Sequence, residues 1–545
     1  MKKLSIIVLF SLVVTSCFRD SGVGARSQNK GQKVRPPFPV KRNETVETWR
    51  RDGWLAIERA KNEKLRKGKA KNVILFIGDG MGVTTLTAAR ILEGQLRGES
   101  GEENRLSFEE FPFTALSKTY STDQQVSDSA PTSTAIVTGV KTDEGVLSVN
   151  QNVRRKDYQS VKGNEAKSLL EMAEENGLST GLVTTTRLTH ATPAACYSHT
   201  PDRNWECDRD ILNGAKDAYE AKFPDIARQL IEFSYGDGLE VALGGGREKF
   251  LPRETRDPEY DDKAGERLDK RDLTQEWRQR NNSSAYVWNR QQFDAIDTSK
   301  TKHLLGLFEP SHMQFGHERP KDKAGEPSLS EMTVKAIDIL AQNKKGYFLM
   351  VEGGRIDHGH HNGNAFRALT ETIELSNAVR TALGKVNLDE TLIVVTADHS
   401  HTLTLQGYPL RGNNILGLVR QLDENGRPEL DYKKDSLGFP ITTLHYTSGR
   451  GYTGASNDQP AGPKKCCEEP QTFEGITSGR PDLSEVDITN PDYLQEVTIP
   501  LKSETHGGED VAIFATGVNA YLVRGSMEQN WIFYVMADAL RFKRE

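Results

Sequence analysis

Five short apolar runs are spaced along the chain, and Gly, Asp or Thr residues bound each of them. The runs are NVILFIGDG (72–80), STGLVTTT (179–186), GYFLMVEGG (346–354), TLIVVTADHS (391–400) and VAIFATG (511–517). Continuous apolar runs of this length are typical of strands that are buried on both faces. We therefore predict that these five segments form the core of a sheet.

Helix-like stretches separate the runs, among them AKSLLEMAEENG and FRALTETIELSNAVRTALGKV, whose apolar residues recur at helical spacing. This alternation predicts an α/β fold with a largely parallel central sheet. Residues 211–330 are rich in charge, and residues 402–505 are rich in Gly, Pro, Asn and Asp. We interpret the first segment as an inserted subdomain or a set of long surface loops, and the second as a further insertion. Ligands of such sheets bind beyond the carboxyl ends of the strands, so those ends are the place to look for chemistry.

Composition narrows the choice of function. The 545 residues carry a net charge of −6, so the chain lacks the basic footprint of a nucleic-acid-binding protein, and we expect no partner of that class. The N-terminus MKKLSIIVLFSLVVTSC has a basic start, an apolar stretch and small residues before Cys17, which is the form of a secretory signal. The rest of the chain has no apolar segment as long as a membrane span requires.

The end of that signal, VTSC, resembles the bacterial lipobox, in which the cysteine is lipidated. We expect a lipoprotein signal over 1–17, a flexible tether over 18–44 and one catalytic domain over 45–545, in an exported periplasmic or cell-envelope lipoprotein attached to the membrane through Cys17. The alternative is a signal peptide with an incidental cysteine. In an exported protein, Cys196 and Cys207 are candidates for a disulfide, with free thiols as the alternative.

Metal-ligating side chains follow the predicted strands. They are Asp79 after the first, His190 and Thr192 after the second, Glu352 and Asp357 after the third, and Asp398 and His399 after the fourth. Carboxylates and imidazoles without thiolates suit zinc, and gathered oxygens suit magnesium. Two metals close together suit an in-line displacement at phosphorus. Ser129, in QVSDSAPTSTA, is a candidate nucleophile at the start of a helix, although it could simply cap that helix.

Six blocks of sequence carry a resemblance to a known family. They are NVILFIGDGMGVTTLTAARIL, VSDSAPTSTAIVTGVKT, TTTRLTHATPAACYSHTPDRNW, VEGGRIDHGHHNGNAFRALTET, TADHSHTLTLQGYPLRG and ETHGGEDVAIFATG. In order and residue type they resemble the alkaline phosphatase family, most closely its animal-type branch. The resemblance implies a three-layer sandwich with a crown-like subdomain and metal-binding loops. It also implies hydrolysis of a broad range of phosphate monoesters through a phosphoserine, and a homodimer.

The resemblance further implies a role for individual residues. Ser129 would form the phosphoserine, and Arg203 would hold two phosphate oxygens. The implied metal ligands are Asp357, His361 and His506 for one zinc; Asp79, Asp398 and His399 for the other zinc; and Asp79, Thr192 and Glu352 for magnesium. His190 and His358 would lie beside the magnesium, and His401 beside the zinc pair. Thr192 replaces the usual serine but keeps the hydroxyl.

A fourth, calcium-like site of the animal enzymes is implied less completely. Its ligands here would be Glu259, the carbonyl of Phe308, Glu309 and Glu326, where Glu326 replaces an aspartate. The alternative is that DPEYDD, which contains Glu259, is a solvated acidic loop. His360 receives no role from the resemblance.

Other functions on the same metal scaffold remain open at this point. A sulfatase would carry a C/S-x-P-x-R motif, which DSAPTST lacks. A phosphodiesterase would generally lack the arginine block and the third metal site, and a phosphomutase is a further relative. The alternative from another class is a metal- or phosphate-binding protein that has lost catalysis. Turnover of a phosphate ester distinguishes these functions.

Overall fold

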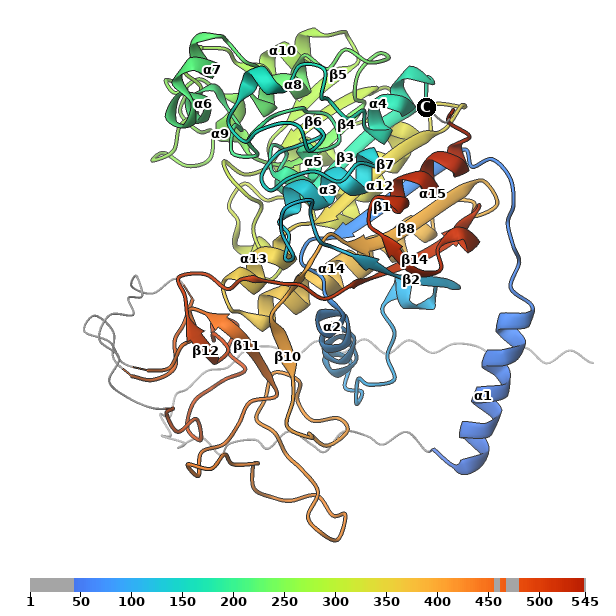
Figure 1. The fold of residues 1–545 in the computed structure, drawn as a ribbon, viewed down its shortest axis with the longest axis vertical. Helices are drawn as coiled ribbons and strands as arrows, with labels where there is room; N and C mark the ends of the chain where they lie inside the picture. Colours follow the sequence, from blue (N-terminus) through green and yellow to red (C-terminus); the bar gives the residue numbers. More distant parts are fainter. Residues whose placement is uncertain (1–43, 455–460, 467–479, 544–545) are drawn as a thin grey trace, which may run out of the picture. The chain divides into compact units, whose positions relative to one another are not determined.

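The structure, a computed structural model, describes residues 44–454, 461–466 and 480–543. A ten-stranded sheet forms the centre of these residues. The strand order is β15-β2-β14-β8-β1-β7-β3-β4-β6-β5 (Figure 1). In that order the bounds are Gly525–Glu528, Phe113–Lys118, Val511–Gly517, Thr391–Ala397, Asn72–Gly78, Tyr347–Gly353, Ser179–Arg187, Val241–Gly245, His303–Leu307 and Ser284–Val287. The five apolar runs are therefore strands β1, β3, β7, β8 and β14, as predicted.

Most neighbouring strands run parallel. β1 pairs in parallel with β7 and β8, β3 with β7 and β4, and β6 with β4 and β5. β14 runs antiparallel to both of its neighbours, β8 and β2. The prediction of a largely parallel sheet is confirmed, and the carboxyl ends of the central strands meet at one edge.

Helices cover both faces of the sheet, because alternate residues of each strand point to opposite sides. Val73 and Leu75 of β1 pack in one hydrophobic cluster with α3, α4 and α15, while Ile74 and Phe76 pack in another with α2, α12 and α14. These helices span Ser129–Thr138, Leu169–Glu175, Trp531–Leu540, Val83–Leu96, Leu329–Leu340 and Ala365–Leu383, respectively. The predicted α/β class with helices on both sides of the sheet is confirmed.

Shorter elements complete the described chain. The helices are α1 Val46–Lys61, α5 Ala191–Ala194, α6 Asp208–Gly214, α7 Lys216–Glu220, α8 Ile226–Ile231, α9 Arg247–Phe250, α10 Leu273–Gln279, α11 Arg290–Asp294 and α13 Arg355–His361. The 3₁₀ helices are η1 Ser107–Glu110, η2 Tyr158–Ser160, η3 Arg319–Lys321 and η4 Ala520–Leu522. A three-stranded sheet contains β10 Leu403–Leu405, β11 Leu444–Gly449 and β12 Val497–Pro500, and a ribbon pairs β9 Ser400–His401 with β13 His506–Gly507.

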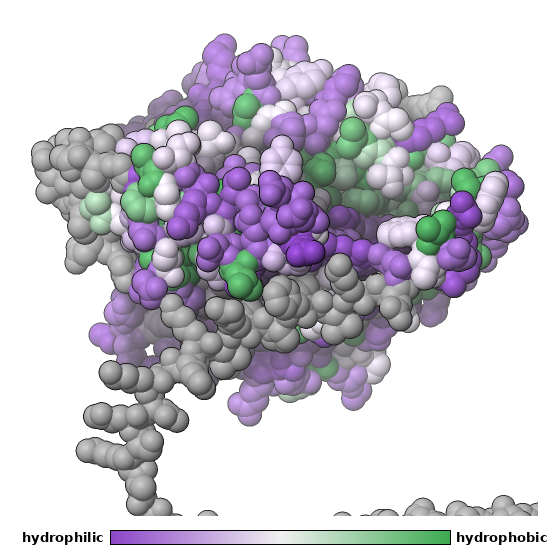
Figure 2. All heavy atoms as spheres, turned by 90° about the horizontal axis from the view of Figure 1, so that it is seen from below, coloured by the Kyte–Doolittle hydropathy of each residue, from purple (hydrophilic) through white to green (hydrophobic). Residues whose placement is uncertain are grey.

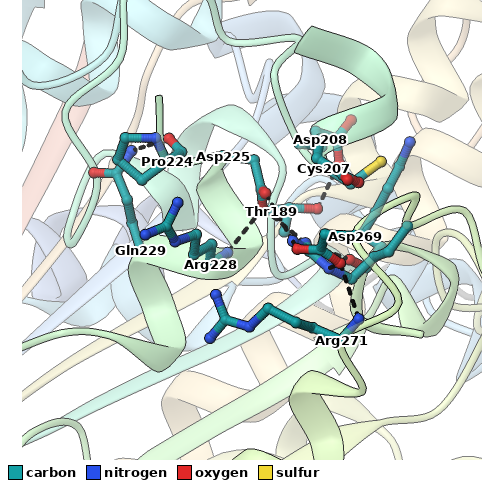
Figure 3. Close-up of polar contacts among 12 residues, drawn as sticks. Thr189, Cys207, Asp208, Pro224, Asp225, Arg228, Gln229, Asp269 and Arg271 are labelled. Atoms are coloured by element: carbon teal, nitrogen blue, oxygen red, sulfur yellow. Dashed lines mark hydrogen bonds and ion pairs between the residues drawn. The ribbon is translucent and has the colours of Figure 1, made fainter. Parts of the chain in front are cut away.

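The charge-rich segment 211–330 differs from the expected insertion, because it adds β4, β6 and β5 to the main sheet. Its short strands β4 and β6 are wholly buried, so they extend the core. Ion pairs hold the surrounding loops. Asp225 caps α8 by accepting a 2.8 Å hydrogen bond from the amide of Arg228, and it accepts two more from the buried Arg267 (Figure 3).

The segment 402–505 contributes the three-stranded sheet and long loops, and its description as an insertion stays a prediction. The expected signal, tether and Cys17 lie outside the described residues. On the face that Figure 2 shows, hydrophilic residues predominate among the coloured residues. Among the described residues, no helix has the length and apolar character to cross a membrane.

The expected disulfide is not formed, and the alternative of free thiols holds for Cys196 and Cys207. Cys196 is buried in the hydrophobic cluster on one face of the sheet. Cys207 caps α6 (Figure 3), and its thiol lies 3.3 Å from Oδ2 of Asp210. The two thiols therefore have different surroundings, which the short spacing in the sequence could not reveal.

Candidate active site

Three adjacent strands, β7, β1 and β8, bring carboxylates to one edge of the sheet. Gly78 of β1 pairs with Ala397 of β8, so Asp79 and Asp398 leave the two strands side by side. Glu352 lies one position earlier on the other neighbour, β7. All three carboxylates are fully buried. The expectation that these residues meet at the carboxyl ends of the strands is confirmed by this register.

Asp79, Asp398 and His399 form a first set, here called the β8 group. His399 Nε2 lies 3.4 Å from Asp79 Oδ1 and 3.3 Å from Asp398 Oδ2. Backbone amides of Gly80 and His399 donate to Asp398 Oδ1, at 3.0 and 2.9 Å, and so fix its other oxygen toward the group. Ser129 Oγ lies 3.2 Å from His399 Nε2 and 3.4 Å from Asp79 Oδ1. The candidate nucleophile therefore sits against a compact set of metal-type ligands.

Asp357, His361 and His506 form a second set, the α13 group. Nδ1 of His361 lies 2.7 Å from the carbonyl of Glu504, and Nδ1 of His506 lies 2.8 Å from the carbonyl of Ser127. A carbonyl can only accept, so both Nδ1 atoms donate a hydrogen bond and both rings turn their Nε2 atoms toward Asp357.

These two Nε2 atoms lie only 3.1 Å apart, and each is within 3.5 Å of Asp357 Oδ1. A carboxylate with two imidazoles that face one another is a typical zinc ligand set. The α13 group therefore fits a zinc ion.

Asp79 also faces a third set, the Glu352 group, with Glu352 and Thr192. Two buried atoms here, Asp79 Oδ2 and His190 Nδ1, have no hydrogen-bond partner, and the hydroxyl of Thr192 lies beside the carboxylate of Glu352. Buried polar atoms without partners carry a desolvation cost that a bound ion would remove. Three oxygens and one nearby imidazole suit a hard cation such as magnesium.

Burial and charge shape the protonation of these groups. Burial, together with the neighbouring Asp398 and Asp357, raises the pKa of Asp79 well above its usual range. Burial raises the pKa of Glu352 to about 7. Burial alone would also raise the pKa of Asp357, but the surrounding histidines, His361 foremost, hold it well below its usual value. Asp79 and Glu352 are thus the carboxylates that a bound cation would stabilise in ionised form.

Arg203 is fixed beside the nucleophile. Ser129 begins α3, and Asp128 caps that helix by accepting from the amide of Ala130 at 3.3 Å. The guanidinium of Arg203 forms an ion pair with Asp128 and lies 3.0 Å from His190 Nε2. Although burial opposes its charge, Asp128 raises the pKa of Arg203, so the cation is permanent. A planar fork held at the start of the helix can bind two phosphate oxygens.

The structure also places the histidines that were expected near the metals. His190 and His358 lie with centroids 5.7 Å apart, and His312, which sequence reasoning missed, lies 4.2 Å from His358. His312 also lies 2.6 Å from the guanidinium of Arg187. A single histidine after LFEPS had no metal-type spacing that could have revealed it.

His401 lies between the α13 group and a carboxylate that the sequence did not suggest. Its Nε2 is 2.7 Å from Asp357 Oδ1, and its Nδ1 is 2.5 Å from Oε2 of the buried Glu504. Burial would lower the pKa of His401, but Glu504 and Asp357 together raise it to about 10. The only hint in the sequence was the position of Glu504, two residues before His506 in ETH.

His360, which had no expected role, is a structural residue. Its ring is fully buried and bridges Thr85 Oγ1, at 3.0 Å, and the hydroxyl of Tyr446, at 2.7 Å. It stacks on His401 with centroids 4.7 Å apart. His360 therefore connects helix α2 to strand β11 beneath the metal ligands.

The carboxylates expected to bind calcium also come together, away from the β8 and α13 groups. Gln314 joins two of them, because its amide donates to Glu326 at 3.1 Å and its side chain donates to Glu309 Oε1 at 3.0 Å. Burial, with Asp322 and Glu309 nearby, raises the pKa of Glu259 to about 8. Phe308 is buried directly before Glu309.

Asp322 is the carboxylate in this region that sequence reasoning missed. Both of its oxygens are buried, and its carboxyl group lies against that of Glu259. We call Glu259, Glu309, Asp322 and Glu326 the carboxylate cluster. The contact between Asp322 and Glu259 shows that the segment DPEYDD, which contains Glu259, is not simply a solvated acidic loop.

The chain resembles known proteins along most of its length. The sequence profile of the family described as alkaline phosphatase matches residues 70–542. The chain is 44% identical over 482 residues to an alkaline phosphatase of Gadus morhua, with 88% of this chain and 93% of the relative covered. It is 44% identical over 483 residues to the human tissue-nonspecific isozyme, covering 88% of this chain and 85% of that protein.

Solved structures agree in fold. The alkaline phosphatase of Thermus thermophilus superposes with a TM-score of 0.60 at 23% identity, covering 89% of this chain and 94% of the other. The enzyme of the Antarctic bacterium TAB5 superposes with a TM-score of 0.55 at 22% identity, covering 88% and 100%. The chain therefore belongs to the alkaline phosphatase family, whose activity is the metal-dependent hydrolysis of phosphate monoesters.

Proposed function

We propose that this chain hydrolyses phosphate monoesters through a phosphoserine on Ser129, with two zinc ions and one magnesium ion bound. The observation that carries the proposal is the position of Ser129 Oγ, within 3.4 Å of both Asp79 and His399. The α13 group would hold one zinc, the β8 group the other, and the Glu352 group the magnesium. When bound, these ions supply positive charge that acidifies hydroxyl groups and stabilises the oxygens of the reacting phosphate.

The residues of the chain do the positioning. Ser129 is 3% exposed at the first position of α3, so its hydroxyl has one direction of approach to a substrate. Its oxygen attacks phosphorus, and the bond from phosphorus to the alcohol oxygen of the substrate breaks. Arg203, held by Asp128, binds phosphoryl oxygens throughout, and water then displaces Ser129 from phosphorus. Orientation and fixed charge account for most of such catalysis.

The test is hydrolysis of an aromatic phosphate monoester by the full chain, with zinc and magnesium supplied or removed by a chelator. We expect turnover that the chelator abolishes and the metals restore. A sulfate monoester and a phosphate diester serve as competing substrates. Faster turnover of either would favour the corresponding relative over a monoesterase, and no chelator-sensitive turnover at all would favour a binding protein.

The carboxylate cluster is proposed to bind calcium. Four carboxylates that approach one another without thiolate or imidazole ligands suit calcium, which takes six to eight oxygens. Glu259 keeps one partial counter-charge, since Arg247 lies 3.2 Å from its Oε2. Metal analysis of the purified chain, with and without calcium in the buffer, tests this proposal.

A homodimer that uses α1 is proposed as well. In the described structure no residue of α1 is buried, and Trp49 and Trp54 are 61% and 69% exposed. A helix with two exposed tryptophans usually has a partner surface. Sedimentation of the full chain should give a dimer, and the paired substitution Trp49→Ser and Trp54→Ser should give monomers.

Export as a lipoprotein is proposed from Cys17 alone. Lipid attachment should be visible in the mass of the N-terminal peptide of the mature protein. The substitution Cys17→Ala should abolish it without changing turnover.

A further inference from the structure

Glu504 contacts His361 of the α13 group directly and reaches Asp357 of that group through His401, although it is not itself one of the proposed ligands. It is 1% exposed and lies in the loop just before β13. Its backbone joins it to His361 twice, because its amide donates to the carbonyl of His361 at 3.0 Å and its own carbonyl accepts from His361 Nδ1 at 2.7 Å. Its carboxylate joins it to the segment that carries His401.

The carboxylate of Glu504 is fully used. Oε2 accepts from His401 Nδ1, and Oε1 accepts from the amide of Thr402 at 2.8 Å and from its hydroxyl at 2.5 Å. These bonds fix both the position and the rotation of the carboxylate. They also require no ion or water, so the arrangement belongs to the protein itself.

This arrangement decides which nitrogen atoms face the α13 group. His401 Nδ1 lies 2.5 Å from Glu504 Oε2, and with this nitrogen turned toward Glu504 the other ring nitrogen, Nε2, lies 2.7 Å from Asp357 Oδ1. Because the Glu504 carbonyl accepts a hydrogen bond from Nδ1–H of His361, the Nε2 atom of His361 is the one that faces the metal position. Rings ligating a metal are commonly oriented in this way through their second nitrogen.

We propose that Glu504 is a positioning residue for the zinc of the α13 group. It acts on Asp357 through His401 with its side chain, and on His361 with its backbone. This inference rests on the proposed function, because it assumes that the α13 group binds zinc. Substitution can remove the contact of the Glu504 side chain with His401 but not the backbone contacts with His361, so the experiment tests the side-chain contact.

The experiment measures zinc affinity of the metal-free full chain by competition with a chromogenic chelator, and turnover separately. Substitution Glu504→Ala should weaken the affinity of one zinc site about 10- to 100-fold, the range typical of residues that orient metal ligands. Substitution Glu504→Gln keeps the shape and one acceptor for Thr402, so we expect a smaller loss, about 3- to 10-fold. Excess zinc should restore a large part of the turnover in both variants.

Glu509 offers a matched control. It lies on the other side of His506, and its Oε1 accepts from Ser400 at 2.5 Å, in the same ribbon as His401. Substitution Glu509→Gln removes this carboxylate without touching the His401 contact. Its zinc affinity should stay within about twofold of the unchanged chain, a range too small to mark a residue that orients a metal ligand.

The outcomes separate this inference from the proposed function. If the unchanged chain binds no zinc or has no zinc-dependent turnover, the proposed function fails. If the unchanged chain is active and Glu504→Ala binds zinc as tightly as the control does, the positioning role is overturned. Should Glu504→Ala fail to fold, Glu504→Gln decides the question by the same comparison with Glu509→Gln.

Discussion

The active edge of the sheet and the carboxylate cluster both gather acidic side chains from distant segments, but they differ in what accompanies the acids. At the active edge, His399, His361 and His506 stand among the carboxylates, with Ser129 within reach. The carboxylate cluster offers oxygens and the cation of Arg247. Imidazole nitrogens favour zinc and its chemistry, whereas oxygens alone favour a hard cation that holds loops together. The comparison teaches that the accompanying residues, more than the number of acids, decide what a site does.

The largest effect should come from removing the nucleophile at the active edge. We expect Ser129→Ala to lower kcat by roughly 10³-fold or more, since the covalent route is lost, while zinc affinity stays nearly unchanged. The substitution Ser133→Ala in the same helix is the matched control, because Ser133 is buried and its hydroxyl has no hydrogen-bond partner. Full activity of Ser129→Ala would contradict the nucleophile role of Ser129, and with it the difference between the active edge and the carboxylate cluster.

The next effect should come from the phosphate-binding cation. Replacement of Arg203 by lysine keeps a charge but loses the planar fork, so we expect kcat/KM to fall by roughly 10²-fold. Arg209→Lys is the control, because Arg209 is half-exposed and pairs with Glu266 at 3.1 Å. Equal kinetics for the two variants would contradict a bidentate role for Arg203.

The carboxylate cluster should affect stability without affecting turnover. Dialysis into calcium-free buffer that contains zinc and magnesium should lower Tm by roughly 2–5 °C, because a ligand that binds the folded state stabilises it. Glu326→Gln should lose this calcium-dependent difference and keep its kcat, while the exposed Glu254→Gln keeps both. A fall in kcat that parallels the fall in Tm would show that the two regions are coupled.

The smallest effect should be a dependence of stability on pH. The pKa of Glu259 is raised from 4.5 to about 8, so between these values the folded state holds a proton that the unfolded chain releases. Stability of the calcium-free protein should therefore fall as pH rises through this window. The slope of Tm against pH should be smaller in Glu259→Gln and smaller again with calcium present. Identical slopes for both proteins would show that Glu259 does not carry the effect.

Much of the fold could be predicted because burial leaves a local mark on the sequence. β1, β7 and β8 are apolar at nearly every position, and residues after them, such as Asp79 and Asp398, share an edge through sheet geometry alone. β4 and β6 were missed because each spans only five residues within a charge-rich segment. Their place in the sheet depends on pairing with distant strands, β4 with β3 and β6 with β4 and β5, which the local sequence does not encode.

The residues of the candidate site likewise divide into those that the sequence predicted and those that it missed. Candidate ligands within one motif, such as Asp357 and His361, follow from their spacing and from the resemblance. Glu504, His312 and Asp322 were missed because their roles exist only through side-chain contacts across the fold, such as the one from Glu504 to His401. The disulfide expectation for Cys196 and Cys207 was wrong for a related reason, since closeness in sequence does not set the direction of two side chains.

The bond from His506 to the carbonyl of Ser127 spans 379 positions, and this has a consequence for the newly made protein. During synthesis the residues of the Glu352 group emerge first, those of the β8 group are complete at His399, and those of the α13 group only at His506. At about 5–20 residues per second, several seconds separate the last two events. A chain synthesised only as far as His399 therefore carries every residue of the Glu352 and β8 groups but lacks His506, so the α13 group is complete only after the intervening segment has been added.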